Sequence, residues 1–170
     1  MREKIKKISL SAFACAFLSV CSIISIPTPF GVPFTLQTFA VCLTGLFLPL
    51  KYSLCSYLAY ITLGVFGIPI FSALGSGIGV ILGATGGFLS GFVFLMLFAG
   101  LSAKKAIKIR IVFCVIGLVL CHISGFCYFS YITSTPIVSA ILVSSAPFII
   151  KDIILVFLSI FIHKRIVSHL

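Results

Sequence analysis

Long apolar runs, separated by short segments rich in glycine, proline or polar residues, dominate the pattern along the chain. The first run extends from Ile8 to Ile26 without a charged residue and ends at Pro27 and Pro29. A helix of that length rises about 28 Å, close to the hydrocarbon thickness of a bilayer. Cleavage before Cys15 would leave too short an apolar region for a signal peptide. We therefore predict a retained transmembrane helix here.

Similar apolar runs recur along the rest of the chain and predict further membrane-spanning helices. Pro49 ends the second run, which is short and is expected to be tilted or partly re-entrant, and Pro147 predicts a kink within the last. The six predicted spans are residues 8–26, 35–48, 52–66, 86–101, 109–128 and 137–162. The fold class is thus an all-α membrane protein of one domain, residues 1–170, with a glycine-rich outside loop before the fourth helix.

Composition agrees with this pattern. Of the 170 residues, 61% are hydrophobic and only 8% are charged, whereas a soluble domain carries roughly a quarter of charged residues. This composition disfavours a soluble enzyme and a disordered tail. The net charge of +10 does not indicate nucleic acid as a partner, because no basic stripe is interleaved with aromatic residues that would stack on bases. The expected surroundings are the lipid bilayer.

The positions of the charges predict the topology. Apart from Lys151, every basic residue falls at the N-terminus, the C-terminus, or the connections near 49–52 and 102–110. The other connections, 27–34, 67–85 and 129–136, carry no charge of either sign. Because cytoplasmic loops carry the excess of Lys and Arg, this alternation predicts an N-in, C-in, multi-pass protein of the cell membrane.

Cysteine and histidine give no sign of a metal site. The seven cysteines form no C-x-x-C pair, and most lie within apolar runs, where cysteine serves as a small hydrophobic residue. His122 stands alone among apolar neighbours and is expected to be a hydrogen-bonded structural residue. Zinc needs three or four clustered ligands, so we expect neither a metal nor a cofactor.

Asp152 is the most unusual residue of the apolar segments. It is the only acidic residue besides Glu3, and a carboxylate at the centre of a bilayer costs about 2.5–3.5 kcal/mol. One interpretation is an acceptor that faces a cavity and binds a polar ligand. The other is local compensation by the neighbouring Lys151, which points about 100° away around a helix and either lines the same cavity or extends its ammonium toward water.

Two segments predicted to lie on the outer side of the membrane contain the remaining candidate binding residues. Residues 75–87 are rich in glycine, but Val80 stands where a dinucleotide fingerprint needs glycine. The segment either forms tight turns whose backbone N–H groups line a site or is a plain flexible loop. Thr35, Gln37 and Thr38 either cap the second helix or face the same outside pocket.

Four segments, in this order, carry a resemblance to a known family. They are residues 33–38 (PFTLQT), 63–71 (LGVFGIPIF), 83–88 (GATGGF), and Pro147-Phe148 followed by Asp152. This order resembles the BioY family, the biotin-specific substrate-binding S components of energy-coupling-factor (ECF) transporters. The resemblance implies a six-helix protein that captures biotin from outside. It also implies a transmembrane coupling protein and two cytoplasmic ATPases as partners, with ATP used by those subunits.

The resemblance also implies roles for particular residues. Asp152 would accept from the ureido N–H groups of biotin, and Ala12 and Ala16 match the A-x-x-x-A face that family members use to contact the coupling protein. The full set of implied substrate-binding residues is Asp152, Lys151, Gln37, Thr35, Ser76, Thr85, Gly86 and Phe88.

The sequence departs from the family at several of these positions. In the family's G-P-T-G-G-Y loop, Ala84 replaces proline and Phe88 replaces tyrosine, while Ser76 is displaced by one residue. In the family's P-F-x-x-G-D-x-x-K pattern, Leu155 stands at the lysine and Lys151 at the glycine. Either Lys151 or the amides of the glycine-rich loop would then hold the biotin carboxylate.

Other functions stay open at this point. An S component for a different vitamin would keep the architecture and change the polar groups of the pocket. A small intramembrane enzyme could use His122 as a base and Asp152 as its orienting partner, provided that the fifth and last spans are adjacent at matching depth. A purely structural subunit explains neither Asp152 nor the glycine-rich loop.

Overall fold

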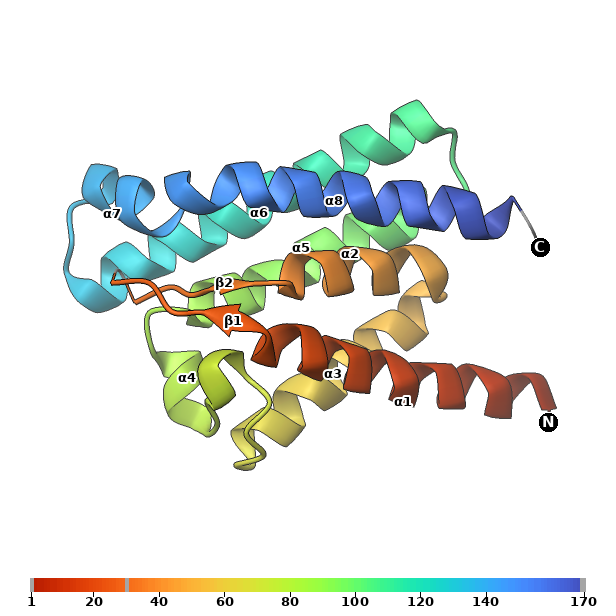
Figure 1. The fold of residues 1–170 in the computed structure, drawn as a ribbon, viewed down its shortest axis with the longest axis horizontal. Coiled ribbons are helices and arrows are strands. Elements are labelled where there is room, and N and C mark those ends of the chain that lie inside the picture. Colours follow the sequence, from red (N-terminus) through yellow and green to blue (C-terminus); the bar gives the residue numbers. More distant parts are fainter. Residues whose placement is uncertain (1, 30, 169–170) are drawn as a thin grey trace.

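The computed structural model describes residues 2–29 and 31–168, and its elements are mostly helices that run side by side along one axis (Figure 1). The longer helices share an apolar composition, which favours intrahelical hydrogen bonding in a bilayer. They are α1 (Arg2–Ile23), α2 (Gln37–Phe47), α3 (Leu50–Val65), α5 (Gly86–Ser102), α6 (Ile107–Thr133) and α8 (Ala146–Val167).

Short elements gather at one end of this bundle, opposite to the end where α1 starts and α8 finishes (Figure 1). The strands β1 (Ser25–Ile26) and β2 (Phe34–Thr35) form an antiparallel pair that sets Ser25 opposite Thr35. The glycine-rich segment is not a plain loop, because it follows the 3-10 turn η1 (Ser72–Leu74) and contains the helix α4 (Ile78–Leu82). Helix α7 (Ile137–Ser144) lies at the same end.

Three helices, α1, α6 and α8, are long and apolar enough to cross a membrane, and α2 and α5 are shorter apolar helices. Each expected span overlaps one of the longer helices, although the ends differ. The largest difference is in the expected span 137–162, which is two helices, α7 and α8, separated at Ser145 (φ −123°, ψ −52°). Pro147 lies in the first turn of α8, where its missing N–H costs nothing. The proline therefore begins a helix and does not kink one.

Helices α5 and α6 pack very closely, because glycines allow their backbones to approach each other. A Cβ atom added at Gly91 would lie 2.8 Å from the carbonyl oxygen of Cys121, and one added at Gly117 would lie 2.9 Å from the Cα of Leu95. Such distances leave no room for a side chain. This contact fixes α6 against α5 and so determines which residues of α6 face the interior.

Helix α2 lies within the bundle and packs against α1, α5 and α8. Ala40, Val41 and Cys42 are fully buried, so the shortest of the longer helices is also the most enclosed. All seven cysteines are free thiols, and those at positions 15, 21, 42, 114 and 121 are buried. Among the described residues, 2–29 and 31–168, no group of three or more His, Cys, Asp or Glu is placed to hold a metal ion.

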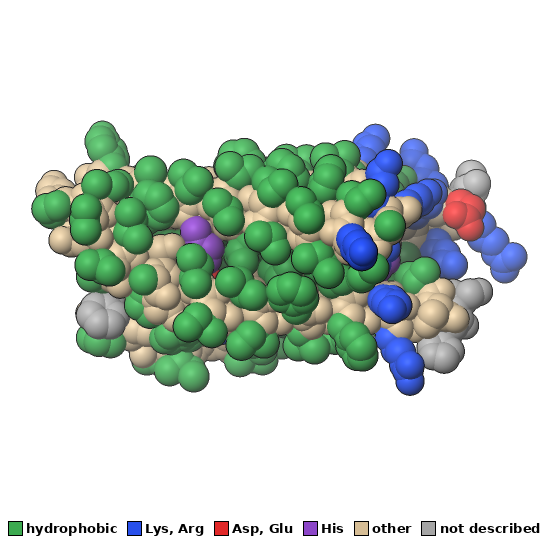
Figure 2. Space-filling view, turned by 90° about the horizontal axis from the view of Figure 1, so that it is seen from above, with side chains coloured by type: hydrophobic (Ala, Val, Ile, Leu, Met, Phe, Trp, Pro, Cys, Tyr) green, Lys and Arg blue, Asp and Glu red, His purple; other side chains and the backbone are tan. Residues whose placement is uncertain are grey.

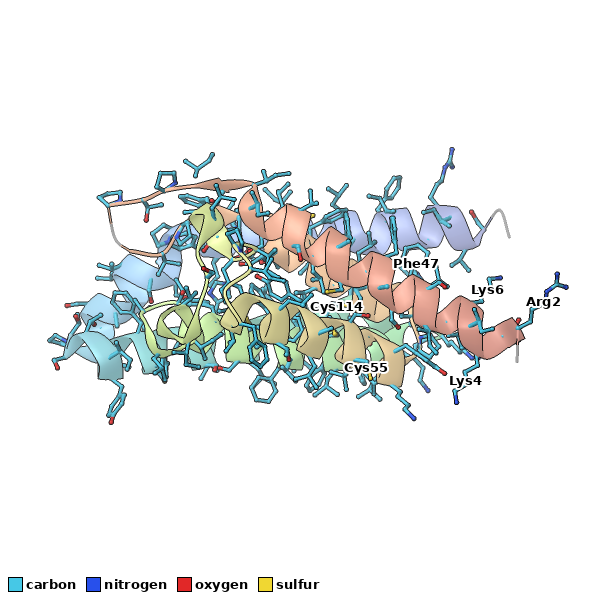
Figure 3. The ribbon with its side chains drawn as sticks, turned by 90° about the horizontal axis from the view of Figure 1, so that it is seen from below. Arg2, Lys4, Lys6, Phe47, Cys55 and Cys114 are labelled. Carbon is cyan, nitrogen blue, oxygen red and sulfur yellow. The ribbon has the colours of Figure 1, made fainter. Side chains whose placement is uncertain are left out.

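The surface is apolar along the length of the bundle and basic at one end. Figure 2 shows hydrophobic side chains over most of the visible face, while the Lys and Arg side chains gather at the end where α1 starts and α8 finishes. Arg2, Lys4 and Lys6 project from that end of α1 (Figure 3). The apolar band with one basic end is the distribution expected for a protein embedded in a bilayer.

The close approach of α5 and α6 gives a test of the packing. Gly91→Leu should lower the apparent thermal midpoint of the detergent-solubilised protein by several degrees, since overpacking costs about 1–3 kcal/mol. Gly79→Leu is the matched control, because a Cβ atom there meets nothing within 4 Å. Equal midpoints for the two variants would contradict the packing described here.

Candidate functional site

A small cavity lies between the short elements and the beginnings of α2, α5 and α8. Its volume is about 40 Å³, so its walls are nearly in contact. The apolar part of the lining consists of Val32, Pro33, Phe71, Val80, Phe88, Leu89, Phe92 and Phe148. The polar part consists of Thr35, Gln37, Thr38, Ser72, Thr85, Lys151 and Asp152. A pocket with apolar walls and a few convergent polar groups is the usual form of a small-molecule site.

Asp152 is the centre of the polar part. Its residue is 6% exposed, and three side chains from three helices approach its carboxylate. Thr38 Oγ1 of α2 donates to Oδ1 at 2.5 Å, and the ammonium of Lys151 lies 2.6 Å from the same oxygen. His122 Nε2 of α6 lies 3.4 Å from Oδ2. The carboxylate is therefore compensated by a cation and by hydrogen-bond donors, as a buried charge requires.

The ammonium of Lys151 compensates the charge of Asp152, and the same side chain lines the cavity. Compensating the charge and lining the cavity are therefore not exclusive alternatives for this residue. Besides its contact with Asp152, its Nζ donates to the backbone oxygen of Thr35 at 3.0 Å. It also lies 6.0 Å from the centre of the Phe34 ring, within the range of a cation–π contact. The flexible stem of lysine overcomes the angular separation of adjacent helical residues.

Several amides of the glycine-rich segment are occupied by other partners. The backbone N–H groups of Gly75, Gly77 and Gly86 donate to Ser72, Gly64 and Gly83 respectively. These bonds form the turns, and they leave those amides without a hydrogen for a ligand. Lys151, by contrast, lines the cavity directly.

Gln37 and Thr35 join the cavity to a second polar network. Gln37 Nε2 donates to Ser22 Oγ at 2.9 Å and to Tyr60 OH at 2.8 Å. Thr35 Oγ1 donates to Gln37 Oε1 at 3.2 Å and accepts from the Gln37 backbone N–H at 3.3 Å. Thr35 thus supports the start of α2 and lines the cavity at the same time. This network links α2 to both α1 and α3.

The structure separates the remaining predicted residues into two groups. Thr85 and Phe88 line the cavity. Ser76 is exposed and lies outside the lining, in a turn where Gly77 has a φ of +85°. Gly86 is buried at the start of α5 and borders a separate apolar groove. A Cβ atom there would collide with the backbone oxygen of Ile81, so Gly86 permits the close packing of α4 on α5.

His122 is the residue of the site that sequence reasoning undervalued. The expectation of a hydrogen-bonded histidine describes its Nδ1, which lies 2.6 Å from Ser145 Oγ. It omits the carboxylate of Asp152 at the other nitrogen and the edge of the ring against Phe88. The signal available was that, among Asp, Glu, Lys, Arg and His, the residues furthest from the ends of the last two long apolar runs are His122, Lys151 and Asp152.

The contacts of His122 also meet the condition set for an intramembrane enzyme, because α6 and α8 are adjacent there. Ser145, His122 and Asp152 even form a continuous hydroxyl–imidazole–carboxylate chain. Ser145 is only 3% exposed, however, and is absent from the lining of the cavity. A nucleophile must reach the substrate, so this chain supports a positioning role and not catalysis.

Ala12 and Ala16 lie far from the cavity. Both are exposed on α1 and border a groove between α1 and α3 whose lining includes the small residues Cys55 and Ala59. Figure 3 labels Cys55 on α3, beside α1. The groove presents a stripe of small side chains on which another helix can pack closely.

Comparison with known proteins decides the family. The model of the BioY family matches residues 1–170. The chain belongs to the BioY family. A protein of Pyrococcus horikoshii described as a probable biotin transporter BioY is 34% identical over 163 residues, which are 96% of this chain and 97% of the relative. The biotin transporter BioY2 of Lactococcus lactis subsp. cremoris is 32% identical over 154 residues, 89% of this chain and 84% of the relative.

A solved structure supports the fold of this BioY-family member. It is the crystal structure of the S component for biotin from an ECF-type ABC transporter, with a TM-score of 0.89. The match covers 98% of this chain and 93% of the other at 24% sequence identity. The family model and the relatives confirm the expected family, and the solved structure agrees with the fold. The curated relatives are named as transporters, which confirms a transport protein of the membrane and not an enzyme.

The ion pair of Lys151 and Asp152 gives a test of the site that needs no ligand. Lys151→Met should destabilise the detergent-solubilised protein by about 3 kcal/mol, because it leaves a buried carboxylate without its cation. The double variant Lys151→Met/Asp152→Leu should recover much of that loss, since it removes both charges. Thermal midpoints measure both effects, and Lys164→Met, an exposed lysine on the same helix, is the control. A double variant less stable than the single one would contradict the pairing.

Proposed function

We propose that this protein captures biotin with high affinity and serves as the membrane substrate-binding component of an ECF-type ABC transporter. The observation that carries the proposal is the Asp152 carboxylate, buried at the cavity with one oxygen left to accept from a ligand. Oδ1 already has contacts of 2.5 and 2.6 Å with Thr38 and Lys151. Among the residues that the structure describes, Oδ2 has only the longer contact of 3.4 Å with His122.

The chemistry of biotin fits these groups. Its ureido ring carries N–H donors, for which Asp152 Oδ2 is the acceptor. Its sulfur-containing ring and alkyl chain are apolar and match walls made of Phe88, Phe92 and Phe148. Its carboxylate needs a donor, and Lys151 has one ammonium hydrogen left beyond those directed to Asp152 and Thr35.

Biotin is larger than a cavity of about 40 Å³, so binding requires part of the wall to move. The segment from η1 to Thr85 is the best candidate. Neither η1 nor α4 contains a buried residue. Moreover, Ser72, Val80 and Thr85 border both the cavity and a groove on its outer side. An outward movement of this segment would join the two and admit the ligand, at small cost in buried contacts.

We further propose six spans with both termini in the cytoplasm. The spans are α1, α2, α3, α5, α6 and α8, while α4 and α7 remain at the outer end with the strands. Support comes from the basic side chains, which gather at the end where α1 starts and α8 finishes (Figure 2), as the positive-inside rule requires for a cytoplasmic face. The cavity would then open toward the outside of the cell membrane.

The energy for transport would come from partners, since the sequence has no Walker A motif. We propose a transmembrane coupling protein and two cytoplasmic ATPases, with the groove beside Ala12 and Ala16 as the contact to the coupling protein. The exposure of both alanines supports this assignment, because a docking face must be free in the isolated protein. No cofactor is proposed.

Equilibrium binding of biotin to the purified protein tests the function directly. We expect tight binding of biotin and none of thiamine or riboflavin. Asp152→Ala should abolish high-affinity binding while the protein still inserts, because the ureido group loses its acceptor. Glu3→Ala, which removes an exposed carboxylate from the start of α1, should bind like the wild type. Unchanged affinity in Asp152→Ala would refute the site, and folded wild-type protein that ignores biotin would refute the ligand.

A second experiment tests the docking face. Ala12→Leu/Ala16→Leu should leave biotin binding by the isolated protein unchanged and strongly reduce ATP-driven uptake by the complex, because bulky side chains hold the partner helix away. Cys127→Leu is the matched control, since Cys127 is exposed on α6, away from the groove. The idea fails if the alanine variant assembles and transports normally.

A further inference from the structure

We infer that His122 takes up a proton when an anionic ligand binds, so that the imidazolium balances the charge that the ligand brings into the site. The inference rests on the proposed function, because biotin's carboxylate is the anion considered. Two observations carry it: the position of His122 against Asp152, and the balance of charges around the cavity.

Before a ligand binds, the charges of Lys151 and Asp152 cancel each other. The ammonium of Lys151 lies 2.6 Å from the carboxylate of Asp152, and the two side chains are 25% and 9% exposed. A carboxylic acid ligand is ionised at neutral pH and adds one negative charge. Lys151 then faces two carboxylates, and the site holds a net negative charge where water is scarce, which is unfavourable.

His122 is the group placed to cancel that charge. Its side chain is 5% exposed and lies 3.4 Å from Asp152 Oδ2, the oxygen proposed above to accept from the ligand. Imidazole is the side chain that changes its charge most readily between pH 5 and pH 8. A proton on His122 would return the occupied site to neutrality, with two cations facing two anions.

Within residues 2–29 and 31–168, the surroundings of His122 supply no other charge for this purpose. Helix α8 presents Asp152 and Lys151, α5 presents the Phe88 ring in a T-shaped contact, and the break between α7 and α8 presents Ser145. Helices α2, α5 and α7 carry no charged residue. On α6 itself, Lys108 and Arg110 lie in the first turns, and the neighbouring thiol of Cys121 faces the backbone of α5.

The contacts of the ring suit both of its charge states. With Asp152 ionised, Nε2 must carry a hydrogen, since a bare nitrogen would face a carboxylate oxygen. Nδ1 lies 2.6 Å from Ser145 Oγ, and a hydroxyl can either donate or accept. Neutral His122 therefore accepts from Ser145, whereas charged His122 donates to it. The change needs only a rotation of the hydroxyl hydrogen.

The consequence is a pH dependence with a defined sign. If the bound form holds one more proton than the free form, affinity for biotin rises as pH falls, by up to about tenfold per pH unit. Biotin amide has the same ring system and no charge, so its affinity should not change with pH in this way. The comparison separates the charge of the ligand from every other effect of pH on the protein.

Calorimetry of the wild-type protein counts the protons. Biotin is titrated at one pH in buffers of different ionisation enthalpy, and the dependence of the observed heat on the buffer gives the protons taken up per ligand. We expect a value approaching one for biotin and near zero for biotin amide. Normal biotin binding without proton uptake would overturn the inference and leave the proposed function intact. Absence of biotin binding by folded protein would overturn both.

The variant His122→Gln tests whether His122 is the residue that takes up the proton. Glutamine keeps an N–H group near the position of Nε2 but cannot take up a proton, so biotin should bind with no proton uptake and no pH-dependent affinity. Proton uptake that persists in this variant would assign the proton to Asp152 or to the ligand, against the inference.

Nitrogen-15 spectra of histidine-labelled wild-type protein, with and without biotin, test the same point without a substitution. His122 should change to the imidazolium signature when biotin binds, and an unchanged neutral signature would refute the inference.

Discussion

The compensation of one carboxylate within an apolar bundle is the constraint on which the site depends. Asp152 is buried on α8, and its partners come from α2, α6 and its own helix. An uncompensated charge there would be too costly for a protein of marginal stability. The helices that surround Asp152 must therefore bring Thr38, His122 and Lys151 together, and the same requirement defines the cavity in which a ligand can bind.

The glycines of α5 and α6 make that arrangement possible. Because Gly91 and Gly117 allow the two backbones to approach closely, α6 lies near enough to α8 for His122 to reach Asp152. The same pairing sets the Phe88 ring against His122. The tight packing of α5 against α6 thus holds the polar side chains of the site in position. Binding sites generally depend on a rigid scaffold in this way.

The sequence predicts the helical elements well, because bilayer-length apolar runs and their proline and glycine boundaries are local signals. It also points to Asp152 and Lys151, since charges within such runs are rare. Contacts between distant helices are not local. Nothing in the residues near His122 or Thr38 shows that both approach Asp152, and nothing near Ser76 shows that its turn directs it outward. The sequence predicts a kink at Pro147, whereas the structure has a break at Ser145, because proline suits both a kink and a first turn.

The site also explains how a departure from the family pattern can be tolerated. Leu155 stands where the family places lysine, one helical turn beyond Asp152, and it is buried. A lysine at 151 reaches the same carboxylate from the adjacent position, because its stem spans the angle between neighbouring residues. In doing so it also contacts the backbone of Thr35, which ties α8 to the start of α2. Moving the cation therefore preserves the charge balance of Asp152 and adds a link between two helices that line the cavity.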